Sequence, residues 1–262
     1  MTSNYLNLIT ETIGSIGVLK INRPKQLNAL NMETLIELER AVTEFDHQTN
    51  IRVIVITGEG EKAFVAGADI AAMREMTPTQ ADEFAHQGHR TMNTIEQASK
   101  PVIACVNGYA LGGGTELALA CDILYASDKA TFGLPETKLS LLPGFGGTQR
   151  MPRLIGVARA KELIFTGKTL SAQEAYELGI VNKVIAHAEL PSAVRSLAET
   201  IAANSPGAIR LAKKVINQGN NLSFQAALEY ERTQFEELFA TQDCKEGLAA
   251  FLEKRKPEFK GA

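Results

Sequence analysis

Three consecutive glycines, Gly112 to Gly114, constrain the fold of this chain more than any other feature. The preceding residues 101–106 are apolar and partly β-branched, which predicts a strand, and residues 115–121 are good helix formers. Glycine loses more backbone entropy on folding than any other residue and buries no side chain, so we expect the run to let backbone approach a ligand closely. The sequence therefore predicts a strand, a tight turn and a helix start in immediate succession.

Two glutamates lie on either side of the next apolar segment. Glu116 is in the first turn of an otherwise apolar helix, and Glu136 follows Pro135 twenty residues later. Taken singly, Glu116 could complement the helix dipole and Glu136 could be a surface residue. Together with the unpaired N–H groups of a glycine-rich helix start, however, two carboxylates are what acid and base chemistry beside an oxyanion requires. Both are candidate catalytic residues.

Six segments together resemble the crotonase superfamily, and within it the enoyl-CoA hydratases, over nearly the whole chain. They are residues 64–70, 107–116, 132–136, 142–150, 166–168 and 253–259. The resemblance implies an α/β fold, a crotonase-like spiral of repeated ββα turns with a C-terminal helical trimerisation region. It also implies reversible syn hydration of a 2-trans-enoyl-CoA to a 3-hydroxyacyl-CoA, in fatty-acid or related acyl-CoA metabolism.

The resemblance also gives individual residues roles. Glu116 corresponds to the base toward water and Glu136 to the acid toward Cα, and because they share one water we expect them to titrate as a coupled pair. The N–H groups of Ala68 and Gly113 correspond to the oxyanion donors. The positions implied to bind the CoA thioester are Arg23, Lys25, Ala66, Ala68, Asp69, Ile70, Ala71, Gly113, Pro135, Gly144, Phe235 and Lys254. Coenzyme A is part of the substrate, and neither a metal nor a separate cofactor is expected.

Other functions stay open at this point. A Δ3,Δ2-enoyl-CoA isomerase would move a proton without adding water, and a non-catalytic relative would bind CoA or RNA. The intact glutamate pair and the net charge of -3 argue against the non-catalytic readings. His86 and His89 have a helical spacing but no third metal ligand nearby. No apolar run reaches the eighteen residues that a membrane span needs, so small molecules are the expected partners.

The order of local signals favours an α/β core followed by a helical layer. Strands are predicted at residues 16–21, 51–56, 101–106, 122–126 and 180–184, and helix starts at Asn31, Thr77 and Ser171, the last two within capping boxes. Helices are predicted at residues 191–204, 206–218, 222–239 and 243–255. We therefore expect a spiral core with the catalytic site over residues 1–204 and a helical oligomerisation region over residues 205–262, forming a homotrimer or homohexamer.

The cysteines and the N-terminal residues bear on location. Cys105, Cys121 and Cys244 are odd in number and lack C-x-x-C spacing, which favours reduced thiols in a reducing compartment. Residues 1–13 contain neither a positive residue nor an apolar signal region, so no secretory or transit segment is visible. We expect a cytoplasmic protein.

Overall fold

The computed structural model describes residues 5–261. Residues 1–4, the start of the N-terminal stretch considered above, and residue 262 lie outside the described part. Within that part the strands form a six-stranded sheet, in the order β1-β2-β3-β5-β7-β10, and a four-stranded sheet, in the order β4-β6-β8-β9. The strands of the larger sheet are β1 (Leu8–Ile13), β2 (Ile16–Ile21), β3 (Val53–Gly58), β5 (Val102–Val106), β7 (Ile123–Ser127) and β10 (Lys183–Ile185). Those of the smaller sheet are β4 (Ala63–Val65), β6 (Tyr109–Leu111), β8 (Thr131–Gly133) and β9 (Thr169–Ser171).

The chain alternates between the two sheets as it advances. β3 leads to β4, β5 to β6 and β7 to β8, and within each sheet these successive strands pair in parallel. The helices α2 (Ile70–Met73) and α3 (Pro78–Gln97) return the chain after β4, and α4 (Gly113–Ala120) returns it after β6. Each turn therefore places one strand in each sheet and one helical connection outside them, which confirms the predicted α/β spiral.

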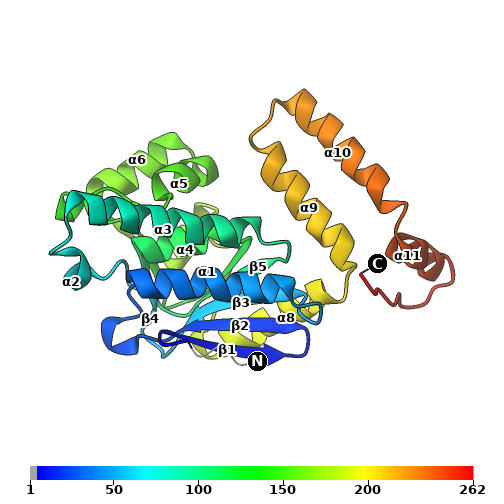
Figure 1. Ribbon diagram of the computed structural model, residues 1–262, viewed down its shortest axis with the longest axis horizontal. Coiled ribbons are helices and arrows are strands. Elements are labelled where there is room, and N and C mark those ends of the chain that lie inside the picture. The colour runs from blue at the N-terminus through cyan, green and yellow to red at the C-terminus, as the bar shows by residue number, and fades with distance from the viewer. Residues whose placement is uncertain (1–4, 262) are drawn as a thin grey trace.

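Helices cover both faces of the six-stranded sheet (Figure 1). On β3, Ile54 and Ile56 point into the main core with α1 (Met32–His47) and α3, whereas Val53 and Val55 point to α8 (Leu190–Ala202). This alternation follows from the two-residue period of a strand. All four side chains are buried, and burying one such side chain contributes roughly 1.5 to 3 kcal/mol.

Local signals at helix starts are confirmed. Asn31 accepts a hydrogen bond from the Thr34 N–H at the start of α1, and capping boxes at Thr77 and Ser171 begin α3 and α7 (Ala172–Glu177). One predicted strand, at residues 180–184, begins too early.

Ile180 donates its N–H to the Ala175 carbonyl in the turn after α7, so β10 begins three residues later, at Lys183.

The remaining helices form two groups. After β8 come the 3-10 helix η2 (Glu136–Leu139), α5 (Gly147–Ile155) and α6 (Val157–Thr166); η1 (Pro24–Gln26) and η3 (His187–Glu189) are short 3-10 turns elsewhere. At the C-terminal end, α9 (Pro206–Gly219), α10 (Phe224–Leu238) and α11 (Gln242–Leu252) lie beside the two-sheet body (Figure 1). We call α9, α10 and α11 the C-terminal arm.

Side chains of α9 bond the C-terminal arm to the two-sheet body. Lys213 of α9 forms a 2.7 Å ion pair with Asp122 and donates to the carbonyl oxygen of Lys100. Asn217, one turn further, donates to the carbonyl oxygen of Glu96 at the end of α3. The predicted division at residue 204 stays a prediction, and so does the role of the arm in trimerisation.

Candidate active site

The predicted catalytic residues follow three neighbouring parallel strands. Ala68 comes three residues after β4, Gly113 and Glu116 come two and five residues after β6, and Glu136 comes three residues after β8. Parallel strands end at the same edge of their sheet, which is where binding sites of α/β proteins gather. The spiral therefore brings to one edge of the four-stranded sheet residues that are up to 68 positions apart in sequence.

The glycine run is explained by contacts within the protein as well as by access to a ligand. Gly112 has a φ of 49°, and a Cβ there would lie 2.8 Å from Glu136 Oε1. A Cβ on Gly114 would lie 1.9 Å from the carbonyl oxygen of Val65, so Gly114 lets α4 pack directly on the backbone of β4. The expectation that all three glycines serve ligand approach is therefore wrong for Gly114, which serves packing.

Two backbone N–H groups at this edge are available. Within residues 5–261, the N–H groups of Ala68 and Gly113 donate to no other protein group. The loop that carries Ala68 is held by bonds on either side of it, from Leu30 N to Gly67 O at 2.9 Å and from Asp69 N to Leu30 O at 2.8 Å. Gly113 is the first residue of α4, where unpaired N–H groups and the helix dipole favour negative charge.

Glu116 is almost completely buried, at 1% exposure. Its Oε1 accepts hydrogen bonds from the N–H groups of Phe145, at 2.8 Å, and Gly147, at 2.7 Å. The pKa of this carboxyl is raised from 4.5 to about 7, chiefly by burial and also by the charge of Glu136, while the two N–H donors and Arg150 oppose the shift. A carboxyl with a pKa near neutral pH is suited to act as a general base or acid.

Glu136 is the first residue of η2 and half-buried. Its Oε2 is buried and has no hydrogen-bond partner in the described part of the chain. Burial raises the pKa of the Glu136 carboxyl as well. A buried carboxyl oxygen without a partner is costly unless it is protonated or meets a ligand, so this oxygen is suited to exchange a proton with one.

Thr115 connects the two strands that precede the glutamates, β6 and β8. Its buried hydroxyl lies within hydrogen-bonding distance of the carbonyl oxygens of Ala110 in β6, at 2.6 Å, and Gly133 in β8, at 2.9 Å, and it accepts a bond from the Gly133 N–H at 3.0 Å. The side chain next to Glu116 thus ties the start of α4 to the strand that leads to Glu136.

Sequence reasoning missed Thr115 and the two N–H donors to Glu116. Phe145 and Gly147 lie in the second glycine-rich segment, residues 143–150, whose glycines were the available signal. Within that segment α5 begins at Gly147. Backbone donors are not encoded by residue type, so only the folded loop identifies them.

The predicted CoA-contacting residues of the two early loops lie together. Arg23 forms a 2.8 Å ion pair with Asp69 and also donates to the Ala29 carbonyl. The ion pair therefore links the loop after β2 to the loop after β4. The pair holds the pKa of Asp69 below its usual range, chiefly through the hydrogen bond from Arg23. Lys25 is exposed nearby. Ala66 is half-buried before Asp69, and Ile70 and Ala71 begin the exposed α2.

Two other predicted binding residues border the glutamates. Pro135 is half-buried directly before Glu136. Gly144 is half-buried, and a Cβ there would meet nothing within 4 Å, so its backbone faces open space next to Phe145. Both belong to the edge at which the glutamates lie.

Phe235 and Lys254 are not brought to this edge. Phe235 lies in α10, 62% exposed, and packs against Phe239, while Lys254 is exposed after α11. Both belong to the end of the chain that lies beside the two-sheet body (Figure 1). The structure of one chain therefore leaves their predicted contact with CoA untested.

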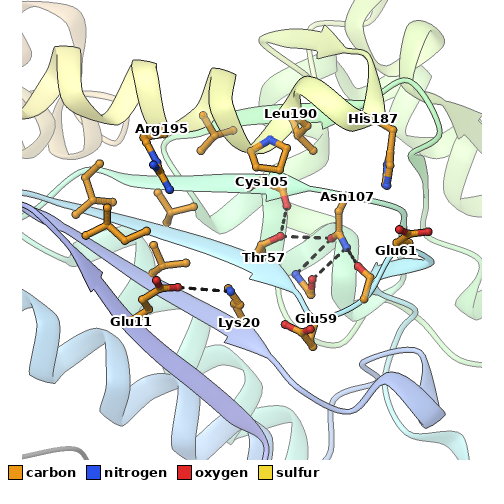
Figure 2. Close-up of a pocket in the computed structure, with 18 of the residues that line it drawn as sticks. Glu11, Lys20, Thr57, Glu59, Glu61, Cys105, Asn107, His187, Leu190 and Arg195 are labelled. Atoms are coloured by element: carbon orange, nitrogen blue, oxygen red, sulfur yellow. Dashed lines mark hydrogen bonds and ion pairs between the residues drawn. The ribbon is translucent and has the colours of Figure 1, made fainter.

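A cavity of about 510 Å³ lies elsewhere, between α8 and the opposite face of the six-stranded sheet (Figure 2). Its lining includes Val18 and Val55 of the sheet and Leu190 and Val194 of α8. Arg195 projects into the space from the helix (Figure 2). None of the predicted site residues lines this cavity. The acid and base groups lie at the edge of the smaller sheet instead.

In residues 5–261, no group of three or more His, Cys, Asp or Glu side chains could hold a metal ion, and His86 and His89 are exposed on α3. No helix of that part of the chain has both the length and the apolar content needed to cross a membrane.

Comparison with known proteins identifies close relatives. The family model described as enoyl-CoA hydratase/isomerase matches residues 11–262. A short-chain-enoyl-CoA hydratase from Clostridium acetobutylicum is 46% identical, over 96% of this chain and 97% of its own length. A crotonyl-CoA hydratase from Syntrophomonas wolfei is 47% identical, over 97% and 98%. The crystal structure of an enoyl-CoA hydratase from Bacillus anthracis superposes with a TM-score of 0.95 at 45% identity, covering 98% of this chain and all of that one.

Proposed function

This chain belongs to the enoyl-CoA hydratase/isomerase family, and we propose that it is an enoyl-CoA hydratase that adds water across the double bond of a 2-trans-enoyl-CoA. One arrangement carries the proposal. Glu116 and Glu136, both with raised pKa values, lie beside the free N–H groups of Ala68 and Gly113. The names of the two relatives above support the same substrate class.

The proposed reaction begins with a water molecule between the two glutamates. Ionised Glu116 takes one proton from the water, and the water oxygen bonds to Cβ of the substrate. The electron pair of the double bond then moves toward the thioester carbonyl, whose oxygen becomes negative. Protonated Glu136 gives its proton to Cα, which yields the 3-hydroxyacyl-CoA, and a later proton exchange resets the pair. In hydration Glu116 acts as the base and Glu136 as the acid, and in the reverse reaction the two roles are exchanged.

The two free N–H groups suit the charge that forms at the thioester oxygen. Ala68 and Gly113 would donate to it, and the start of α4 behind Gly113 adds its dipole. Removing one donor of this kind typically costs about 3 kcal/mol of barrier. This chemistry calls for no metal or redox cofactor, because coenzyme A is part of the substrate.

We propose that the chain assembles as a homotrimer or a dimer of trimers through the C-terminal arm. Phe224, Phe251 and Leu252 of the arm are each at least 80% exposed, and such apolar surface marks an interface. A neighbouring subunit would then supply Phe235 and Lys254 to the CoA site. A cytoplasmic location rests on Cys105, Cys121 and Cys244, all free thiols in the structure.

Crotonyl-CoA tests the proposal directly. Purified protein should remove the absorbance of the conjugated thioester as water adds, and 3-hydroxybutyryl-CoA should be the product. The comparison substrate is a 3-enoyl-CoA of the same length. If the protein converts the 3-enoyl to the 2-enoyl thioester much faster than it hydrates crotonyl-CoA, it is an isomerase and the proposal fails.

A further inference from the structure

The two N–H groups that hold Glu116 belong to a loop, residues 143–147, that needs support of its own. Phe145 and Gly147 donate to Glu116 Oε1 only while the loop keeps its path across α4. The Phe145 ring provides one anchor, since it packs edge-on against Phe84 at 5.2 Å between ring centres and fits against Gly88 of α3. That anchor fixes the side chain of Phe145, whereas the peptide groups of the loop need a polar one.

Arg150 supplies the polar anchor. Its Nη1 donates to the carbonyl oxygen of Phe145 at 3.2 Å, so one residue of the loop gives its N–H to Glu116 and its carbonyl to Arg150. The other nitrogens of the guanidinium bind α3: Nε and Nη2 donate to Glu96 Oε2 at 2.9 and 2.5 Å, and Nη2 donates to Asn93 Oδ1 at 3.0 Å. The side chain is 15% exposed. Arg150 thus joins the loop to α3 through a planar group that is bonded at three nitrogens.

The backbone of the loop is shaped around this guanidinium. Gly146 has a φ of 106°, which side-chain-bearing residues rarely adopt, and a Cβ there would lie 2.3 Å from Arg150 Nη1. Glycine at this position therefore admits both the turn and the close approach of Arg150.

We propose that Arg150 is a positioning residue for the hydration reaction, which holds residues 143–147 so that the Phe145 and Gly147 N–H groups point at Glu116 Oε1. This inference rests on the proposed function, because it deepens the role of Glu116 in it. Arg150 does not touch the reacting atoms and acts through the loop.

The charges around Glu116 determine in which direction loss of Arg150 should shift the Glu116 pKa. Glu136 of η2 disfavours the ionised form of Glu116, whereas Arg150 of α5 favours it, and Glu96 of α3 partly neutralises Arg150. Loss of Arg150 would remove a favourable charge and loosen two N–H donors to the carboxylate. Both changes make Glu116 harder to ionise, so both raise its pKa.

Three variants distinguish the effect of the loop-holding hydrogen bonds of Arg150 from the effect of its charge. Arg150→Met removes the hydrogen bonds and the charge, whereas Arg150→Lys keeps the charge but cannot bond at three nitrogens in one plane. Arg153→Met is the matched control, because Arg153 lies one turn along α5, is exposed, and among the described residues bonds only to Gln149 of the same helix. Circular dichroism checks that each variant is folded.

The first measurement is the pH profile of crotonyl-CoA hydration. In Arg150→Met we expect the acid limb to move up by about one pH unit and kcat to fall about tenfold, with KM changed little, because the loss concerns the reacting base rather than binding. Arg150→Lys should lose kcat with a smaller shift of the limb, and Arg153→Met should match the parent. A parental kcat in Arg150→Lys, or a parental profile in Arg150→Met, overturns the proposal.

The second measurement does not depend on hydration. Carbon NMR of protein labelled at the glutamate carboxyl, with the Glu116 signal assigned by Glu116→Gln, should show the Glu116 pKa raised in Arg150→Met and unchanged in Arg153→Met. An unchanged Glu116 titration in Arg150→Met overturns the positioning role. If the parent protein lacks hydratase activity but Arg150→Met still raises the Glu116 pKa, the proposed function is contradicted and the positioning role of Arg150 stands.

Discussion

Gly112 and Glu136 approach each other so closely that the smallest side chain on Gly112 would lie 2.8 Å from the Glu136 carboxyl. The residue that opens the glycine run is thus in contact with the second glutamate of the site. The backbone at Gly112 and the side chain of Glu136 therefore cannot change independently.

Gly112→Ala should therefore lose most activity while remaining folded. The substitution strains a backbone with φ 49°, at a cost of about 1 to 3 kcal/mol, and displaces Glu136. We expect a fall in kcat of about a hundredfold or more. Gly14→Ala is the matched control, since Gly14 has a φ of 59° but nothing within 4 Å of a Cβ. Activity retained by Gly112→Ala at the level of Gly14→Ala would show that the contact with Glu136 does not matter.

Glu116→Gln and Glu136→Gln should each lower kcat for crotonyl-CoA hydration by at least about a hundredfold, the lower end for one acid or base. The double variant should fall far less than the product of the two effects, because both carboxylates act on one water. Stopped-flow and steady-state rates measure this, with circular dichroism as the folding check. A Glu116→Gln protein that hydrates at nearly the parent rate would rule out the two-glutamate mechanism.

Stability should respond to pH through Glu116. Its pKa is about 7 in the folded protein against 4.5 ordinarily, so the folded state favours the protonated form and the parent loses stability as pH rises through this window. Glutamine does not ionise. The stability of Glu116→Gln relative to the parent should therefore increase between pH 4.5 and 7.5, by up to about 3 kcal/mol. Urea unfolding at both pH values, at one protein concentration, measures the difference, and a difference independent of pH would contradict the buried, raised pKa.

Neighbouring glycines should respond differently to alanine. In Gly114→Ala the new Cβ meets a backbone oxygen 1.9 Å away, so α4 must move off β4, and we expect a loss of about 3 kcal/mol or more, or no folding. In Gly113→Ala the nearest atoms are 3.2 Å away, in the Phe145 ring, so the overlap is far smaller than at Gly114. That variant should fold and lose activity instead. Thermal unfolding combined with the hydration assay distinguishes them, and equal stability of the two variants would be the contrary result.

The assembly prediction concerns the C-terminal arm. Light scattering should show a trimer or hexamer at micromolar concentration, and Phe251→Asp should dissociate it, because Phe251 is 83% exposed in the single chain. Lys254→Ala should raise KM for CoA thioesters with little change in kcat, since it removes binding common to ground and transition states. A parent protein that is a stable monomer would contradict the first expectation, and a selective loss of kcat the second.

The sequence predicted those parts of the structure that local chemistry determines. The capping boxes at Thr77 and Ser171 and the cap at Asn31 mark real helix starts, because each depends on residues within one turn. The spiral and the glutamate roles came from resemblance. Strands β4, β6 and β8 have three residues each, too few for a periodic pattern, and only their pairing defines them.

Other features depend on partners that are distant in sequence. β1 was not predicted, although it pairs with β2 along its whole length, and the buried Glu37 accepts the N–H groups of Leu6 and Asn7 just before it. The contact of Gly114 with β4 and the bonds from residues 143–147 to Glu116 also join segments far apart in the chain. No single-residue preference reports such contacts, so they could not be read from the sequence.

The order β4, β6, β8 in the smaller sheet separates catalytic geometry from substrate choice. Ala68, Glu116 and Glu136 each come within five residues of the end of one of these strands, so the paired strands, about 4.8 Å apart, hold the three segments side by side. The exposed Ile70 and Leu142 lie in segments outside that sheet. Changes in such outer segments need not move either carboxylate. A chain of this design can acquire a new substrate range by altering loops while it keeps the same chemistry.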